Sequence, residues 1–380
     1  MTLALFDTLE VYIRRMLGSS LNLKFPVGRT LLLSTFFLFL LLLLGEMVTR
    51  SMWFQSKMPV GEWGTDFRHV ATKLDQLKSF TSQKGSLDCL FLGNSMVLNG
   101  VDPESFSQAY QEQTGQAIDC FNFGIDGMPA AGAGAFVDVL VDDFQPRLLF
   151  YFGDAVDFTI GPDAWYSTIF TEMPWLRHRR GEFDLKGNLV ENSALYRSRR
   201  ALFHILQLDF RSAFVDWDEW DDAGQGNRNG YMPYENEAFD VTVPPDLEIM
   251  RQLEGFHYAL LNNYTIYPEN VRGLERIINQ TNKDTQVIVV QMPVPDIYMT
   301  FFGDGENDYQ RFIELVEDST ESGQVRFVKT IPTLSFADDD WYDYGHLDAA
   351  GAEIFSRWLG GYFGRLVVEG EVSLTTTATE

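Results

Sequence analysis

An uncharged apolar segment near the amino terminus most strongly constrains how this 380-residue chain can fold. Thr30 to Gly45 reads TLLLSTFFLFLLLLLG, and with its flanks the apolar stretch extends from about Phe25 to Val48, interrupted late by Glu46. About 20 helical residues, at a rise of about 1.5 Å each, cross the hydrocarbon layer of a bilayer. We therefore expect a transmembrane helix over 27–48.

The flanks of this segment favour an uncleaved anchor over a signal peptide, the competing interpretation. The apolar region is long and begins late, and the following GEMVTRSMW has no small-x-small cleavage site. Before the uncharged run that begins at Thr30, four basic and two acidic side chains give a net charge of +2. The positive-inside rule then places the segment 1–26 in the cytoplasm. The main domain is expected to be periplasmic or extracellular, attached to the cytoplasmic membrane by this single helix.

The remaining composition narrows the classes of partner. The chain has 54 acidic against 29 basic side chains, a formal net charge of -25. A nucleic-acid surface needs basic side chains to neutralise phosphates, so no nucleic-acid partner is expected. Cys89 and Cys120 are too few for a disulfide framework, and both lie in predicted strands. We expect two buried free thiols, with a bridge only if the strands are neighbours in an oxidising compartment.

Beyond a juxtamembrane linker and helix at 49–84, short apolar segments alternate with helical ones. This alternation is typical of a parallel sheet covered on both faces, a three-layer α/β/α fold over 85–365. The pattern breaks at about 161–245, which we interpret as an insertion, and 366–380 is expected to be a disordered tail. The predicted strands are Leu87 to Leu92, 117–124, Arg147 to Gly153, 286–293 and 324–330. The predicted helices are 67–80, a segment from Pro103, 129–144, 269–282 and Ala349 to Phe363.

Two short motifs carry side chains suited to catalysis. Ser95 directly follows the first strand, at the sheet edge where ligands collect in such folds. Asp343 and His346 stand three residues apart just before the last helix, a spacing that lets a carboxylate orient an imidazole. The alternative is structural: Ser95 as a helix cap, Asp343 and Asp348 as solvated caps, and His346 as a packing residue.

The stretches FLGNSMVLNG, FNFGIDG and DYGHLDAAG resemble, in order and placement, the sequence blocks of SGNH (GDSL-like) hydrolases. The resemblance covers about Leu87 to Phe158 and Thr285 to Phe363 and implies a flavodoxin-like parallel sheet. It implies that Ser95 is the nucleophile, with Asp343 and His346 as its partners. It also implies that the backbone N–H groups of Ser95 and Gly124 hold the oxyanion.

Two departures from the family pattern concern the lining of this site. The usual Gly-Asp-Ser reads Gly93-Asn94-Ser95. The third block usually contains an asparagine that donates to the oxyanion, but this chain has Asp154 and Asp157 there. An ionised aspartate would repel the oxyanion, and losing one donor costs on the order of 3 kcal/mol in barrier. Asn122 or a loop donor is the candidate replacement.

The anchored layout is similar to that of extracytoplasmic partners of membrane-bound O-acyltransferases. This resemblance implies ester hydrolysis or acyl transfer on an envelope glycan, polymer or lipid, with a membrane-bound acyltransferase as partner. The alternative is a catalytically silent SGNH-like subunit or scaffold of a membrane complex.

Other features indicate neither a cofactor nor a metal. No Cys/His spacing suggests zinc, and the glycines have no phosphate-loop signature. The acidic run Asp216 to Asn227 is interpreted as a solvated loop rather than a calcium site. Six arginines in the insertion favour pairing with the domain's own carboxylates over contact with anionic lipid. They are Arg177, Arg179, Arg180, Arg197, Arg199 and Arg200.

Overall fold

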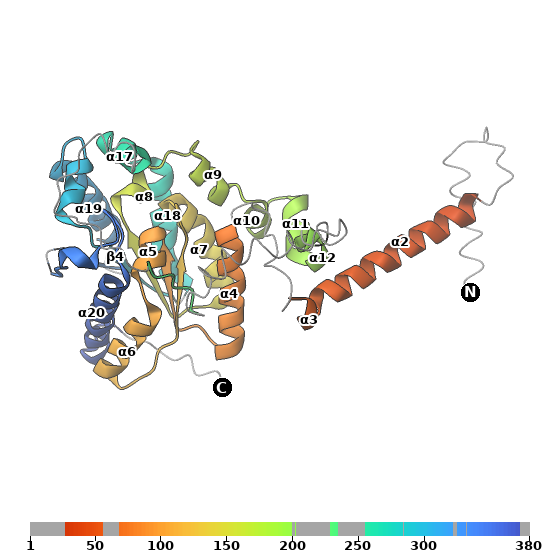
Figure 1. Ribbon diagram of the computed structural model, residues 1–380, viewed down its shortest axis with the longest axis horizontal. Coiled ribbons are helices and arrows are strands. Elements are labelled where there is room, and N and C mark those ends of the chain that lie inside the picture. Colours follow the sequence, from red (N-terminus) through yellow and green to blue (C-terminus); the bar gives the residue numbers. More distant parts are fainter. Residues whose placement is uncertain are drawn as a thin grey trace. The chain divides into compact units, whose positions relative to one another are not determined.

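A computed structural model describes most of the chain as two compact units (Figure 1). The first unit comprises Met1–Gly61 and Asn192–Phe214, and the second comprises Glu62–Glu191 and Val215–Glu380. The residues described are 27–55, 68–199, 202, 229–234, 255–283, 285–321, 325–331 and 333–372. The predicted cytoplasmic segment 1–26, the acidic run Asp216 to Asn227, Arg200 and the last eight residues of the predicted tail lie outside them.

The second unit is built on a five-stranded parallel sheet with the strand order β2-β1-β3-β4-β5. This is the flavodoxin-like order, and it confirms the predicted fold class. All residues of β1, β2 and β3 are buried, as expected for strands covered on both faces. The strands are β1 Cys89–Gly93, β2 Cys120–Gly124, β3 Leu148–Gly153, β4 Gln286–Gln291 and β5 Arg326–Val328.

Helices cover the two faces of this sheet (Figure 1). On one face α6 (Pro103–Thr114) packs against α20 (Ala349–Val368), and on the other α7 (Ala130–Phe144) packs against α18 (Pro268–Ile278). The strand register explains this division. Phe91 of β1 lies opposite Asn122 of β2 and contacts the ring of Phe106 on α6. Phe123, one residue further along β2, therefore points to the other face, where it meets Phe136 of α7.

Of the remaining helices of the second unit, the sequence analysis predicted α4, whereas α8 to α11, α17 and α19 were not predicted. The last helix also ends at Val368, five residues beyond the predicted end, so residues 366–372 of the predicted tail are described. The helices are α4 Arg68–Lys84, α5 Ser95–Gly100, α8 Ala155–Thr159, α9 Trp165–Thr171, α10 Pro174–Arg179, α11 Leu185–Asn192, α17 Gly255–Asn262 and α19 Glu306–Thr320, with 3-10 helices η2 Asn279–Lys283, η3 Asp296–Phe301 and η4 Asp338–Asp340.

Cys89 and Cys120 form a disulfide, so the expectation of two free thiols is wrong. The two residues lie directly opposite one another in the parallel pairing of β1 with β2, with Cα atoms 4.5 Å apart. Both side chains are buried. The sequence marked both as strand residues but did not show that the two strands are neighbours in this register.

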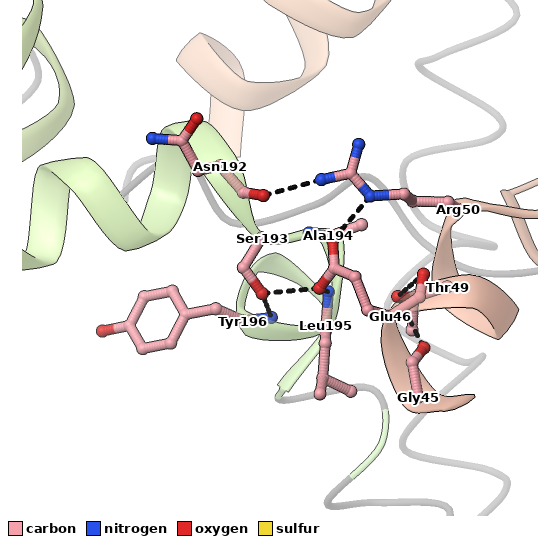
Figure 2. Close-up of polar contacts among 9 residues, drawn as sticks. All are labelled: Gly45, Glu46, Thr49, Arg50, Asn192, Ser193, Ala194, Leu195 and Tyr196. Atoms are coloured by element: carbon pink, nitrogen blue, oxygen red, sulfur yellow. Dashed lines mark hydrogen bonds and ion pairs between the residues drawn. The ribbon is translucent and has the colours of Figure 1, made fainter. Parts of the chain in front are cut away.

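The first unit contains α2 (Val27–Arg50), α3 (Met52–Gln55) and α12 (Ala194–Arg197). Within α2, Thr30–Arg50 is long and apolar enough to cross a membrane. The carboxylate of Glu46 accepts hydrogen bonds from the Ser193 hydroxyl (2.7 Å) and from the N–H groups of Ala194 (2.8 Å) and Leu195 (3.1 Å) (Figure 2). Part of the predicted insertion therefore packs against the carboxyl end of the apolar helix.

Within the second unit, the arginines of α10 pair with acidic side chains. Arg179 forms an ion pair with Asp143, and Arg177 forms one with Glu182 at 2.8 Å. Arg180 also lies 3.4 Å from Glu182. The structural interpretation of the arginine cluster is confirmed for these three residues.

Candidate active site

Ser95 lies at the carboxyl end of β1 because the chain turns sharply from strand to helix there. Gly93 permits the turn, since a Cβ atom at this position would lie 2.4 Å from Val97 and 3.0 Å from the carbonyl oxygen of Phe152. Asn94 then caps α5, its side-chain oxygen accepting the N–H of Met96 at 2.8 Å. Ser95 is the first residue of α5 and its hydroxyl faces the rim of the sheet.

Asp343 and His346 lie in a tight turn that precedes α20. One carboxylate oxygen of Asp343 accepts the N–H groups of Gly345 (2.8 Å) and His346 (2.7 Å). An antiparallel bridge between Trp341 and Leu347 closes the base of this turn. Asp348 is the cap of α20, as the structural interpretation proposed for it, whereas Asp343 is bonded to the histidine ring.

The fold brings these two motifs together. The Nε2 atom of His346 lies 2.8 Å from the Ser95 hydroxyl oxygen, and its Nδ1 atom lies 2.9 Å from both carboxylate oxygens of Asp343. The carboxylate fixes the tautomer: Nδ1–H donates to Asp343, which leaves Nε2 to accept the serine proton. This is the geometry of a Ser–His–Asp triad.

The Asp343 carboxyl is held in its charged form. Burial acts to raise its pKa, but the charge of His346 and hydrogen bonds from the His346 ring and the N–H groups of Gly345 and His346 outweigh burial. The pKa therefore lies below its ordinary value of 3.8. An ionised Asp343 can stabilise the imidazolium that forms when His346 accepts a proton.

A pocket opens beside the Ser95 hydroxyl, with an empty volume of about 430 Å³ that includes its mouth. It is lined by Asn94, Ser95, Met96, Asp154, Val156, Tyr298, Phe301, Asp343, Tyr344, Gly345 and His346. The triad thus shares the lining of this pocket with residues from the end of β3 and from η3.

Asp154 and Asp157 belong to the third sequence block, which differs from the family pattern. They take different positions at the end of β3. Asp154 lines the pocket and caps α8, its Oδ2 atom accepting the N–H of Val156 (3.1 Å) and the hydroxyl of Tyr298 (2.7 Å). Asp157 is buried behind it and accepts the N–H of Asp154 (3.1 Å) and the side-chain amide of Asn94 (2.8 Å). Asn94 therefore links the turn that presents Ser95 to the third block.

Burial strongly raises the pKa of Asp157, and the negative charge of Asp154 raises it further. The hydrogen bonds from the Asp154 N–H and the Asn94 amide oppose this shift but do not cancel it. The raised pKa favours the protonated form of Asp157.

Gly124 does not offer its N–H group to the pocket, which corrects the oxyanion role expected for it. That N–H donates to the side-chain oxygen of Asn122 at 2.8 Å. Glycine is needed there for another reason: a Cβ atom would lie 2.3 Å from the backbone nitrogen of Leu98 on α5. Asn122 is not a replacement donor either, because its amide donates to the carbonyl oxygens of Val97 and Val101, both at 2.7 Å.

Sequence reasoning missed several aromatic side chains around the triad. Tyr234 packs edge-on against the His346 ring, with centroids 5.5 Å apart, and stacks on Tyr342 at 3.9 Å. It belongs to the described segment 229–234, and the buried side chain of Lys73 holds this segment by donating to the carbonyl oxygens of Asn122 and Gly230. Nothing in the local sequence around Tyr234 marks it, since its partners are more than 100 residues away.

No cluster of three metal-ligating side chains occurs among the residues that the structure describes. The polar side chains that line the pocket are those of Asn94, Ser95, Asp154, Tyr298, Asp343, Tyr344 and His346.

Comparisons with known proteins find matches among solved structures at low sequence identity. No family model and no curated protein matches the chain. A Streptococcus pneumonia protein described as a platelet activating factor is 13% identical, with a TM-score of 0.36 over 78% of this chain and 94% of that one. The lipase/acylhydrolase from Enterococcus faecalis is 10% identical, with a TM-score of 0.35 over 77% and 100%. A Desulfitobacterium hafniense protein of the G-D-S-L lipolytic family is 11% identical, with a TM-score of 0.34 over 74% and 99%.

Proposed function

We propose that this chain is a membrane-anchored, extracytoplasmic serine esterase or O-acyltransferase of the SGNH type. Its substrate would be an ester on an envelope glycan, polymer or lipid. The observation that carries the proposal is the 2.8 Å distance between the Ser95 hydroxyl and His346 Nε2, with Asp343 on the other ring nitrogen. A helix cap or packing histidine would not require this arrangement of three side chains from the two ends of the domain.

The reaction follows from these positions. Ser95 attacks the ester carbonyl while His346 Nε2 accepts its proton, and the resulting imidazolium is stabilised by ionised Asp343. His346 then returns the proton to the leaving alcohol, which leaves an acyl group on Ser95. Attack by water completes hydrolysis, and attack by a sugar or polymer hydroxyl completes transfer.

The oxyanion would be held by backbone N–H groups. The N–H of Ser95 has no hydrogen-bond partner among the described residues. We assign the second donor to Gly127 in place of Gly124. Gly127 has a φ of 67° in a turn closed by the Met128 N–H and the Ile125 carbonyl, and its own N–H bonds to no described residue. The N–H of Ile125 donates to the Gly93 carbonyl oxygen at 3.0 Å, which sets this turn beside the end of β1.

Two features support the extracytoplasmic location. The basic residues before α2 favour a cytoplasmic amino terminus and an outer main domain. The disulfide between Cys89 and Cys120 supports the same side, because the cytoplasm keeps protein thiols reduced. A membrane-bound acyltransferase is the partner that would supply or accept the acyl group if the reaction is transfer.

Labelling with a fluorophosphonate probe tests the proposed reaction. The detergent-solubilised full chain is expected to be labelled, and Ser95→Ala is expected to abolish labelling. Ser335→Ala, at an exposed serine outside the pocket, is the matched control and should be labelled like the wild type. If the folded wild type is not labelled, the scaffold alternative is favoured, and retention of a bound membrane partner in a pull-down would support it.

Protease protection tests the topology. In spheroplasts of a bacterial host that expresses the chain, added protease should digest the main domain, whereas a tag fused to the amino terminus should survive until the membrane is permeabilised. Protection of the main domain would place it in the cytoplasm and overturn the proposed orientation.

A further inference from the structure

The pocket has an unusual balance of charge for a site that must stabilise an oxyanion. Its lining contains two carboxylates, Asp154 and Asp343, and neither lysine nor arginine. Asp343 is engaged by the His346 ring and two backbone N–H groups. Asp154 belongs to the part of the pocket wall formed by the end of β3 and η3, and the triad chemistry does not use it.

Asp154 is built into this wall rather than exposed at its rim. Its residue is 2% exposed, and Tyr298, which donates to its Oδ2 atom, is 4% exposed. The Val156 N–H donates to the same oxygen. Both donors favour the ionised form of the Asp154 carboxylate.

Three aromatic rings stand around the same space. Tyr298 and Phe301 from η3 have ring centroids 5.7 Å apart, and Phe301 meets Tyr344 edge-on at 5.6 Å. All three line the pocket together with Asp154. A carboxylate among aromatic rings is the environment that attracts alkylammonium groups, because the ring faces and the carboxylate both present negative potential.

We propose that Asp154, Tyr298, Phe301 and Tyr344 form a subsite for an alkylammonium group carried by the ester substrate. This inference rests on the proposed function, since the subsite lies in the same pocket as the Ser95 hydroxyl. The substrate class that it proposes is esters that carry a positive charge. The ammonium group would pair with the Asp154 carboxylate inside the pocket, where water screens the attraction less than at the surface. An anionic group at the same position would be repelled.

The cation could lie on the alcohol or on the acyl part of the ester, and matched substrates distinguish the two. For the alcohol side, acetylcholine is compared with 3,3-dimethylbutyl acetate, in which carbon replaces the charged nitrogen. For the acyl side, the phenyl ester of 4-(trimethylammonio)butanoate is compared with that of 5,5-dimethylhexanoate. We expect the wild type to favour the cationic member of one pair by about tenfold in kcat/KM, the effect of one partly buried charge contact. Equal rates within both pairs would overturn the proposal.

A charge-removing variant assigns the preference to Asp154. Asp154→Asn should reduce the cationic-to-neutral ratio of kcat/KM to about one. Asp318→Asn, which removes the same charge from an exposed position on α19, should keep the wild-type ratio. If Asp154→Asn retains the tenfold preference, another group recognises the cation and the proposal is wrong.

A binding measurement separates this inference from the proposed reaction. Calorimetric titration of the full chain with tetramethylammonium chloride, against sodium chloride at equal ionic strength, should show binding to the wild type and to Ser95→Ala. If Ser95 is not labelled and no ester is cleaved, the proposed function fails, but tetramethylammonium binding still supports the subsite. No binding to the folded wild type would overturn the subsite while leaving the esterase proposal to the labelling experiment.

Discussion

Asp343, which is half-buried, and Asp157, which is buried, are both carboxyl groups at the carboxyl edge of the sheet, yet their environments drive their pKa values in opposite directions. Asp343 has the His346 ring and two N–H groups as partners, and its pKa is lowered. Asp157 has a second aspartate as its neighbour, and its pKa is strongly raised. Burial raises the pKa in both cases, so the difference comes from the partners. A buried carboxyl group therefore has no charge that can be assigned from its residue type alone.

The largest expected effect is on the rate of ester cleavage and comes from removing the charge of Asp343. Asp343→Asn should reduce ester cleavage by about 10³- to 10⁴-fold, because an amide cannot stabilise the imidazolium and disturbs the tautomer of His346. Steady-state kinetics on an aryl ester measure this effect.

Asp157→Asn is the matched variant, since it replaces a carboxyl group whose raised pKa favours the neutral form. It should lower the same rate by less than about tenfold. If the two variants lose similar activity, Asp157 is charged in the folded protein and the contrast between the two carboxyl groups is incorrect.

A second, smaller effect tests the wall beside His346. Lys73→Met removes the donor to the carbonyl oxygens of Asn122 and Gly230 and should lower the free energy of unfolding by about 3 kcal/mol, measured by urea denaturation. It should also raise KM by releasing Tyr234 from the triad. Lys78→Met, at an exposed position on the same helix, should change stability by less than about 0.5 kcal/mol. Equal losses in both variants would mean that Lys73 does not hold this segment.

A third effect concerns the hydrogen bond between Tyr298 and Asp154 in the pocket wall. Tyr298→Phe removes the hydroxyl that donates to Asp154 and should lower the free energy of unfolding by about 2 kcal/mol, because a buried carboxylate loses a donor. Urea denaturation checks this value. An unchanged midpoint of the urea transition would indicate that a water molecule replaces the hydroxyl as the donor to Asp154.

The smallest effect is the pH dependence of stability, which should differ in both sign and window for the two carboxyl groups. The lowered pKa of Asp343 contributes stability above 3.8 that is lost as the pH falls below that value. The raised pKa of Asp157 contributes stability below 3.8 that is lost as the pH rises above it. Each slope is at most about 1.4 kcal/mol per pH unit.

Unfolding free energies from pH 2 to 7 check these slopes. Relative to the wild type, Asp157→Asn should gain stability as the pH rises above 3.8. Asp343→Asn should lose stability, relative to the wild type, as the pH rises toward 3.8 from below. Parallel curves for both variants would contradict the opposite pKa directions.

The parts of this molecule that depend on local pattern were predictable from the sequence. The apolar helix, the order of strands and helices, and the turn that presents Ser95 follow from hydropathy and from small residues at the strand end. The partners of Ser95 followed from the resemblance of DYGHLDAAG to a family block. Helix α19 was not predicted, although its buried residues Tyr309, Phe312, Ile313 and Val316 recur with helical spacing.

The parts that depend on packing between distant segments were not predictable. Gly124 matches a family position, but its N–H is used by a side chain two residues earlier, and only the close approach of α5 explains the glycine. Tyr234 lies beside His346 because Lys73, on a helix 160 residues earlier in the chain, holds its segment. The protonation of Asp157 depends on the neighbouring carboxylate and on burial, neither of which a single sequence displays.

The disulfide between β1 and β2 constrains the strands next to the turn that presents Ser95. Its two sulfur atoms meet only when Cys89 stands opposite Cys120, and a slip of two residues would carry them about 7 Å apart along the strands. Closing the bond therefore selects one alignment of the neighbouring strands, and Ser95 follows six residues after the first sulfur. Formation of the disulfide would therefore secure the alignment of the part of the sheet from which Ser95 emerges.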